Sequence, residues 1–142
     1  MELQSRLRLS LLLLRLGVFI VMIMWTLDKF VNPAHSAAVA ENFYMLEGLG
    51  SGVLAVIGAV QLVIVLAFVA GFFKRLSYGL VLLMHAVSTF SSYQQYLNPW
   101  DNLLFFAAWP MLAACVALYL LREADSLLTV DDLLAGRKPK EA

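Results

Sequence analysis

The stretch LGSGVLAVIGAVQLVIVLAFVAGFF (residues 49–73) decides the fold, together with LSYGLVLLMHAVSTFSSYQQY (residues 76–96), which follows it after Lys74-Arg75. A bilayer core about 30 Å thick requires about 20 helical residues at 1.5 Å each, and both stretches reach that length. Because only two residues join them, the two helices are expected to be antiparallel neighbours. The sequence therefore predicts a helical hairpin that spans a membrane.

Two further apolar stretches flank this hairpin. The first, residues 9–30, ends before Asn32-Pro33, since proline cannot continue the hydrogen-bond ladder of a helix. The other, residues 102–121, follows Pro99-Trp100-Asp101, where we expect Asp101 to cap the helix and Trp100 to anchor it at the membrane interface. The predicted fold class is an all-α membrane protein, an antiparallel bundle of four transmembrane helices. We place its domain at residues 1–121, with helices at 9–30, 49–73, 76–96 and 102–121, a loop at 31–48, and a cytoplasmic tail at 122–142.

The composition agrees with this class and excludes others. Hydrophobic residues make up 62% of the 142 residues, whereas a soluble domain carries roughly 45–50%. Ten basic and ten acidic residues give a formal net charge of zero, so no basic field is present to bind nucleic acid. Cys115 is the single cysteine, which excludes an internal disulfide and a cysteine metal cluster formed by this chain alone.

The cations are distributed unevenly between the two sides of the predicted bundle. Loops rich in lysine and arginine stay on the cytoplasmic side of a membrane. One side carries only Lys29, and the other carries Arg6, Arg8, Lys74, Arg75, Arg122, Arg137, Lys138 and Lys140. This distribution predicts a multi-pass protein of the bacterial inner membrane with both termini in the cytoplasm. Arg15, inside the first helix, is expected to snorkel to the inner surface.

The first apolar stretch has an alternative interpretation as a cleaved secretory signal, because Ala38-Val39-Ala40 is similar to a cleavage site. A signal core has about 7 to 15 residues, and this stretch is longer. We therefore keep it as a membrane-spanning helix.

The tail predicts a short amphipathic helix. Residues 126–134 mix leucines with Asp131 and Asp132, and Thr129 and Asp132 have the spacing of a capping box. We expect this helix to lie on the inner membrane surface, followed by Arg137-Lys138-Pro139-Lys140, a basic segment suited to anionic headgroups. Docking to a cytoplasmic subunit is the alternative function of the tail.

One face of the third predicted helix is polar. Its residues recur at helical spacing and should point into the bundle; they are His85, Ser88, Thr89, Ser92 and Tyr96. Gln61 lies near the middle of the second helix, so antiparallel packing places its amide at a depth similar to that of the His85 imidazole. Hydrogen bonds between packed helices are the simplest role for these groups, and a ligand site is the functional alternative.

Several short motifs resemble those of the DoxX-type membrane proteins. The first helix has Leu14-Arg15-Leu16-Gly17 and Leu27-Asp28-Lys29-Phe30, and the second has Gly58-Ala59-Val60-Gln61 followed by Gly71 and Arg75. These motifs cover about the first half of the chain. Gln61 stands where that family commonly has a glutamate, and Thr26 where a glycine is usual, so the resemblance does not extend to a proton-carrying carboxyl at residue 61.

The resemblance implies a four-helix protein of the bacterial inner membrane, linked in some members to quinone-coupled sulfur oxidation or to oxidative-stress complexes. We therefore expect a membrane subunit associated with redox metabolism. Whether it is an enzyme stays open; if it is catalytic, the expected class is a quinone-linked oxidoreductase subunit. The alternative is a non-catalytic assembly or scaffold subunit of a larger membrane complex, or a homo-oligomer. A small transporter is disfavoured because the sequence has no broken helices or paired repeats.

A quinone site requires an apolar cleft, one or two hydrogen-bond donors and an aromatic ring. We assign no catalytic residue and predict a cofactor site formed by Gln61, His85, Ser88, Thr89 and Trp109. Haem is disfavoured because His85 is the only histidine at membrane depth, while His35 lies in the outer loop. We predict no metal site, since His35 with Glu41 or Glu47 has no recurring metal-ligand spacing.

Charged residues near the outer ends of the helices form an outer charged rim of Asp28, Lys29, Glu47 and Asp101. Adjacent helical residues point about 100° apart, so Lys29 is expected to pair with Glu47 or Asp101 rather than with Asp28. Such a rim is usually solvated. The alternatives are the mouth of a cavity or a docking face for a soluble partner.

Overall fold

The computed structural model describes residues 2–136, and this part of the chain is helical with no strand. Its long helices are α1 (Leu3–Val31), α3 (Ser51–Val69), α4 (Lys74–Ser91) and α6 (Ala108–Leu120). The shorter elements are α2 (Pro33–Tyr44), α5 (Tyr93–Leu97), α7 (Val130–Leu134) and the 3₁₀ turns η1 (Pro99–Asp101) and η2 (Leu103–Ala107). The predicted all-α class is confirmed for this range, and the basic segment of residues 137–140 lies outside it.

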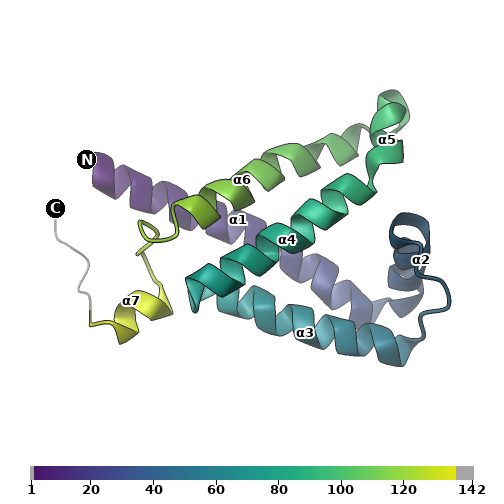
Figure 1. Cartoon of the computed structure of the whole chain (residues 1–142), viewed down its shortest axis with the longest axis horizontal. Helices are drawn as coiled ribbons and strands as arrows, with labels where there is room; N and C mark the ends of the chain where they lie inside the picture. The colour runs from purple at the N-terminus through teal and green to yellow at the C-terminus, as the bar shows by residue number, and fades with distance from the viewer. Residues whose placement is uncertain (1, 137–142) are drawn as a thin grey trace.

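The four long helices pack in a cycle. Both α1 and α4 contact α3 and α6. In Figure 1, α1 runs from the N-terminus towards α2, α3 returns, α4 runs back towards α5, and α6 returns again. We call the end with the α3–α4 turn and α7 the tail end, and the opposite end the α2 end. The closely packed core lies towards the tail end and consists of Leu11, Val18, Phe68, Tyr78, Val81, Cys115 and Leu118.

The helix α4 buries polar side chains and exposes large apolar ones, which is unusual for a helix of a water-soluble domain. Ser77, His85 and Thr89 of α4 are buried, whereas Leu83 and Phe90 of the same helix are 58% and 60% exposed. An apolar exterior over buried polar groups is compatible with contact with lipid. Within the described range, three segments are long and apolar enough to cross a membrane: Leu3–Val31, Ser51–Val69 and Leu103–Leu120. The 18-residue helix α4 is not among them, because Lys74, Arg75 and its polar residues lower its mean hydropathy.

The segment predicted as a loop, residues 31–48, contains the 12-residue helix α2. Pro33 occupies the first turn, where its missing N–H is not needed and its fixed φ suits a helix. Met45 ends the helix in the left-handed conformation, with φ of 56°. This helix was not predicted because its 12 residues do not form an apolar stretch of membrane-spanning length. In the structure α2 packs against α1 and α3.

The start of the last long helix also differs from the prediction. Asp101 does not cap it; this residue lies in η1, and the Asn98 amide donates to its Oδ2 at 2.7 Å. The α-helix begins only at Ala108. Pro110 has no N–H to donate to the carbonyl of Phe106, four residues earlier, and its ring disfavours an α-helical turn there. The preceding residues therefore form the tighter 3₁₀ turn η2.

The tail forms a shorter helix than predicted, and it docks on the α3–α4 turn. The predicted helix at residues 126–134 is reduced to α7. Backbone N–H groups of Val130 and Asp131 donate to the carbonyls of Ala70 and Gly71, at 2.8 and 3.2 Å. Thr129 precedes α7 as predicted, but its hydroxyl bonds to the Asp132 side chain and caps no backbone N–H. The tail is thus attached to the helices by backbone and side-chain bonds.

Candidate functional site

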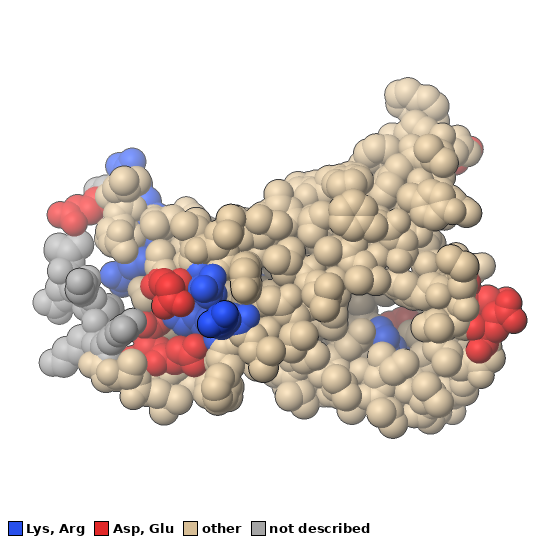
Figure 2. Space-filling model, in the orientation of Figure 1, with Lys and Arg blue, Asp and Glu red and all other residues tan. Residues whose placement is uncertain are grey.

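A cavity of about 970 Å³ lies between the helices towards the α2 end. Its walls come from α1, α2, α3, α4 and the segment of η2 and α6. The volume falls at the upper end of the roughly 300–1,000 Å³ that is usual for small-molecule sites. Figure 2 shows a hollow in the face towards the viewer, with a Lys or Arg side chain inside it.

The cavity exists because the helices diverge and their facing residues are small. In Figure 1, α3 and α4 separate from their turn towards the α2 end. Gly17 on α1 and Ala108 and Ala114 on α6 line the space, and their side chains are too short to fill it. Ser36, Ala40 and other residues of α2 line the wide end, so α2 forms part of the wall there.

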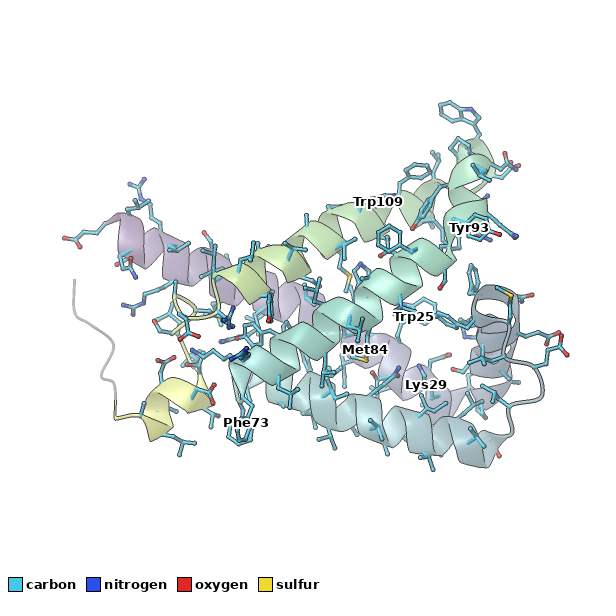
Figure 3. The ribbon with its side chains drawn as sticks, in the orientation of Figure 1. Trp25, Lys29, Phe73, Met84, Tyr93 and Trp109 are labelled. Atoms are coloured by element: carbon cyan, nitrogen blue, oxygen red, sulfur yellow. The ribbon has the colours of Figure 1, made fainter. Side chains whose placement is uncertain are left out.

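The structure brings three of the predicted site residues to this cavity. Gln61 of α3 and His85 and Ser88 of α4 all line it. Thr89 is buried behind His85, and its hydroxyl donates to the His85 carbonyl at 2.8 Å. Trp109 is not among the lining residues; it is 40% exposed and packs against the rings of Phe90 and Tyr96. Several other aromatic residues line the cavity, among them Trp25 of α1 (Figure 3) and Phe43, Tyr44 and Phe105.

The His85 imidazole is held by one of its two nitrogens. Its Nε2 lies 3.0 Å from the carbonyl oxygen of Ala108 and 3.3 Å from the Thr89 hydroxyl. A carbonyl only accepts, so Nε2 carries the hydrogen and the neutral ring has an acceptor at Nδ1. This Nδ1 has no hydrogen-bond partner within residues 2–136. His85 thus presents an acceptor that remains available.

The Gln61 amide and the Ser88 hydroxyl likewise have no hydrogen-bond partner in the described part of the chain. The expected contact between Gln61 and His85 is not made, although both line the same space. A polar group in apolar surroundings is unfavourable by roughly 2–7 kcal/mol unless it finds a partner. These groups are therefore suited to bind a polar atom of a molecule in the cavity.

The four residues of the outer charged rim do not form one network. Asp28 Oδ2 accepts from the Ser36 hydroxyl at 2.5 Å and lies 2.8 Å from His35 Nδ1, which ties α2 to the end of α1. Glu47 is exposed in the loop after α2. Asp101 belongs to η1, where Asn98 binds it.

Lys29, the remaining member of the predicted rim, lines the cavity (Figure 3). Its Nζ donates to the carbonyl of Trp25 at 3.1 Å. The predicted pairing with Glu47 or Asp101 does not form, and no carboxylate among the described residues makes an ion pair with this lysine. The cavity therefore contains one cation with only a carbonyl as its hydrogen-bond partner.

A second polar cluster lies at the tail end, and the sequence analysis missed it. The Arg15 side chain is 1% exposed and donates to Asp125 Oδ2 and to the Tyr78 hydroxyl, both at 3.1 Å, and to the Leu127 carbonyl at 2.6 Å. The Tyr78 hydroxyl also donates to Asp125 Oδ2, at 2.8 Å. The prediction that Arg15 snorkels to the inner surface is wrong, because the tail covers the guanidinium.

Lys74 completes this cluster. Its Nζ donates to the Asp125 carbonyl at 2.8 Å and to Asp132 Oδ2 at 2.6 Å. Burial raises the pKa of the Asp125 carboxyl above its ordinary value, while the hydrogen bond from Tyr78 and the charge of Arg15 act in the opposite direction. The sequence contains one signal for the cluster. A charged residue inside a membrane helix requires a partner of opposite charge, and Glu123 and Asp125 are the first two acids after the predicted helix at 102–121.

These features define an all-helical protein with an apolar exterior, a cavity lined by polar groups without protein partners, and a tail fastened by buried ion pairs. No family model, no curated protein and no solved structure matches the chain. The function is therefore inferred from the residues of the site.

Proposed function

We propose that this chain is a multi-pass protein of the bacterial inner membrane, similar to the DoxX-type proteins, with four spanning helices and both termini in the cytoplasm. In addition to the three apolar segments, α4 is the remaining spanning helix. Its polar face lies towards the helices that it contacts, α3 and α6. Two observations support this arrangement. The exposed side chains of the long helices are largely apolar, and Lys74 and Arg75 lie at the end that also receives the tail.

Within this arrangement, the cavity binds an apolar small molecule that carries oxygen atoms able to accept hydrogen bonds, and a quinone is the first candidate. The observation that carries the proposal is that Gln61, His85 and Ser88 line one cavity and each has a polar group without a partner in the described chain. Gln61 and Ser88 would donate to the carbonyl oxygens, and Trp25 would contact the ring. A bound quinone supplies reversible electron transfer, which makes the chain a subunit associated with redox metabolism.

The ligand would reach the cavity from the lipid. The helices α3 and α4 diverge, and the hollow in Figure 2 lies on that face. An apolar molecule dissolved in the bilayer does not have to cross water to enter such an opening.

The test is a titration of the protein in lipid nanodiscs with a short-chain ubiquinone analogue, followed by tryptophan fluorescence. The starting variant carries Trp100→Phe and Trp109→Phe, so that Trp25, which lines the cavity, is the remaining reporter. We expect saturable quenching. Gln61→Leu should weaken binding about fivefold or more, because a hydrogen bond to a ligand oxygen contributes about 1 kcal/mol or more.

Gln94→Leu is the matched control, since Gln94 is exposed in α5 and does not line the cavity. Its affinity should equal that of the starting variant. Quenching that never saturates, and is the same in all three proteins, would contradict the binding function. The scaffold alternative would then be preferred, and it rests on the exposed leucines of the docked tail, Leu128, Leu133 and Leu134.

A further inference from the structure

Lys29 is the one lysine, arginine or carboxylate residue among the described residues that line the cavity, and the proposed function leaves it unassigned. It belongs to the last turn of α1 and lines the cavity together with Gln61 and Trp25. Within residues 2–136 its one hydrogen bond is to the carbonyl of Trp25, one turn earlier in the same helix. The ammonium charge therefore faces a largely apolar space without an ion-pair partner in residues 2–136.

The nearest acid in the sequence is directed elsewhere. Asp28 is adjacent to Lys29, but its Oδ2 is bound by Ser36 and His35 of α2. Neighbouring residues on a helix point about 100° apart. The Asp28 carboxylate, which binds α2, therefore does not enter the cavity beside Lys29. The charge of Asp28 acts on Lys29 from a distance, but within residues 2–136 no carboxylate forms an ion pair with its ammonium, so that position is open to an anionic group of a ligand.

The position of Lys29 is fixed by close packing between α1 and α3. A Cβ added at Gly58 would lie 3.2 Å from Lys29 Cβ and 2.8 Å from Phe30 Cζ, so the two helices touch at this glycine. Gln61 follows Gly58 by three residues, which places it about one turn along the same side of α3. Lys29 and Gln61 therefore stand on adjoining walls, and one small polar group could contact both.

The rest of the cavity is suited to an apolar body. Away from the α2 end its lining consists of residues such as Leu13, Leu14, Leu83 and Ala114. A molecule whose polar group lies at Lys29 would place its apolar part against these side chains.

From these contacts we propose that Lys29 is the counter-ion of an anionic oxygen group carried by the ligand of the cavity. The ligand class is then an amphiphilic anion, with one acidic group beside Lys29 and Gln61 and an apolar body in the rest of the space. This inference rests on the proposed function, since it requires that the cavity binds a small molecule. An ionised hydroxyquinone and a long-chain carboxylic acid share this chemistry.

The experiment uses two matched pairs of probes on the full chain in nanodiscs of zwitterionic phospholipid. The first pair is an alkyl hydroxynaphthoquinone, which is an anion at neutral pH, and the same alkyl naphthoquinone without the hydroxyl. The second pair is a long-chain carboxylic acid and the alcohol of equal length, measured by displacement of the bound quinone. We expect the anion of at least one pair to bind the wild-type chain at least tenfold more tightly than its neutral counterpart. The pair that shows the preference identifies the source of the anionic group.

The variants separate charge from shape. Lys29→Met keeps the approximate length of the side chain and should abolish the preference, so that the anionic and neutral probes bind about equally. Binding of the neutral probe shows that the cavity is still folded. Lys29→Arg should retain most of the preference. Arg75→Met, at an exposed cation of the tail end, should leave it unchanged.

Equal binding of anionic and neutral probes to the wild type, or a preference that persists in Lys29→Met, would overturn the role of Lys29 and leave the cavity function standing. Failure of all four probes to bind saturably would overturn the proposed function itself, and with it this inference.

Discussion

Arg15 shows at the scale of one residue how this protein accommodates a charge in an apolar helix. Its guanidinium is buried and contacts Tyr78 of α4 and Asp125 and Leu127 of the tail. A buried ion pair contributes little net stability by itself, because both charges lose their hydration. The loss of one partner is different, since it leaves the other charge buried without compensation.

Arg15→Leu should therefore lower the free energy of unfolding by about 3–5 kcal/mol, the usual effect of breaking a buried pair. Reversible unfolding in mixed detergent micelles measures this change. Arg15→Leu combined with Asp125→Leu should recover part of the loss, because both charges are then absent. Arg75→Leu, at an exposed position, should change stability by less than about 0.5 kcal/mol. Equal effects of Arg15→Leu and Arg75→Leu would show that the cluster does not stabilise the fold.

Residue-scale predictions from the sequence succeeded where the local pattern carried the information. The helical spacing of His85, Ser88 and Thr89 correctly placed these residues on an inward face, and two of them line the cavity. The partners of Lys29 and Arg15 could not be predicted in the same way. Arg15 and Asp125 are 110 residues apart in sequence, so their contact depends on where the tail folds back.

At the scale of the elements, the attachment of α7 depends on the α3–α4 turn. Gly71 has a φ of +61°, which residues with a side chain rarely adopt, and an added Cβ would lie 2.6 Å from Thr129 Cβ. Asp131 also accepts from the backbone N–H groups of Phe73 and Lys74, at 2.9 and 3.0 Å. A side chain at residue 71 would therefore overlap with Thr129 and oppose docking of the tail on the turn.

Gly71→Ala should loosen the tail, because both the strained φ and the overlap with Thr129 oppose docking. A substitution of this kind is unfavourable by about 1 kcal/mol or more, so hydrogen exchange of the backbone amides of Val130 and Asp131 should accelerate about fivefold or more. Gly52→Ala is the control, since its Cβ would meet nothing within 4 Å. Unchanged exchange in Gly71→Ala would mean that the tail is held by other contacts.

The element boundaries show which signals a sequence contains. The long helices were predicted because runs of apolar residues mark them, and the start of the first was placed at residue 9 rather than at Leu3. The helix α2 and the 3₁₀ turns before α6 were missed. Both depend on proline, which was interpreted as an end to helical structure, although Pro33 in fact begins a helix.

The whole molecule separates its charges from its apolar surface. On the face shown in Figure 2 most acidic and basic side chains lie towards the two ends, apart from the Lys or Arg in the hollow, and a broad uncharged region lies between them. Such a distribution fits a protein whose middle contacts hydrocarbon and whose ends contact water and headgroups. The proposed orientation then gives each end a defined side of the membrane.

The orientation can be tested with single cysteines in a Cys115→Ser background and a maleimide that does not cross membranes. Glu47→Cys, in the exposed loop after α2, should react in intact spheroplasts. Arg75→Cys, also exposed but at the tail end, should react only after permeabilisation. Labelling of both cysteines in intact cells, or the opposite pattern, would contradict the assignment of the tail end to the cytoplasm.

The bond between Arg15 and Asp125 also has a consequence for biosynthesis. Arg15 leaves the ribosome early, and its carboxylate partner follows 110 residues later. In the membrane arrangement proposed above, the guanidinium therefore lacks this carboxylate until residue 125 has been synthesised. The ion pair can form only once the tail has been added, and a chain truncated before residue 125 would leave the buried Arg15 guanidinium without this partner.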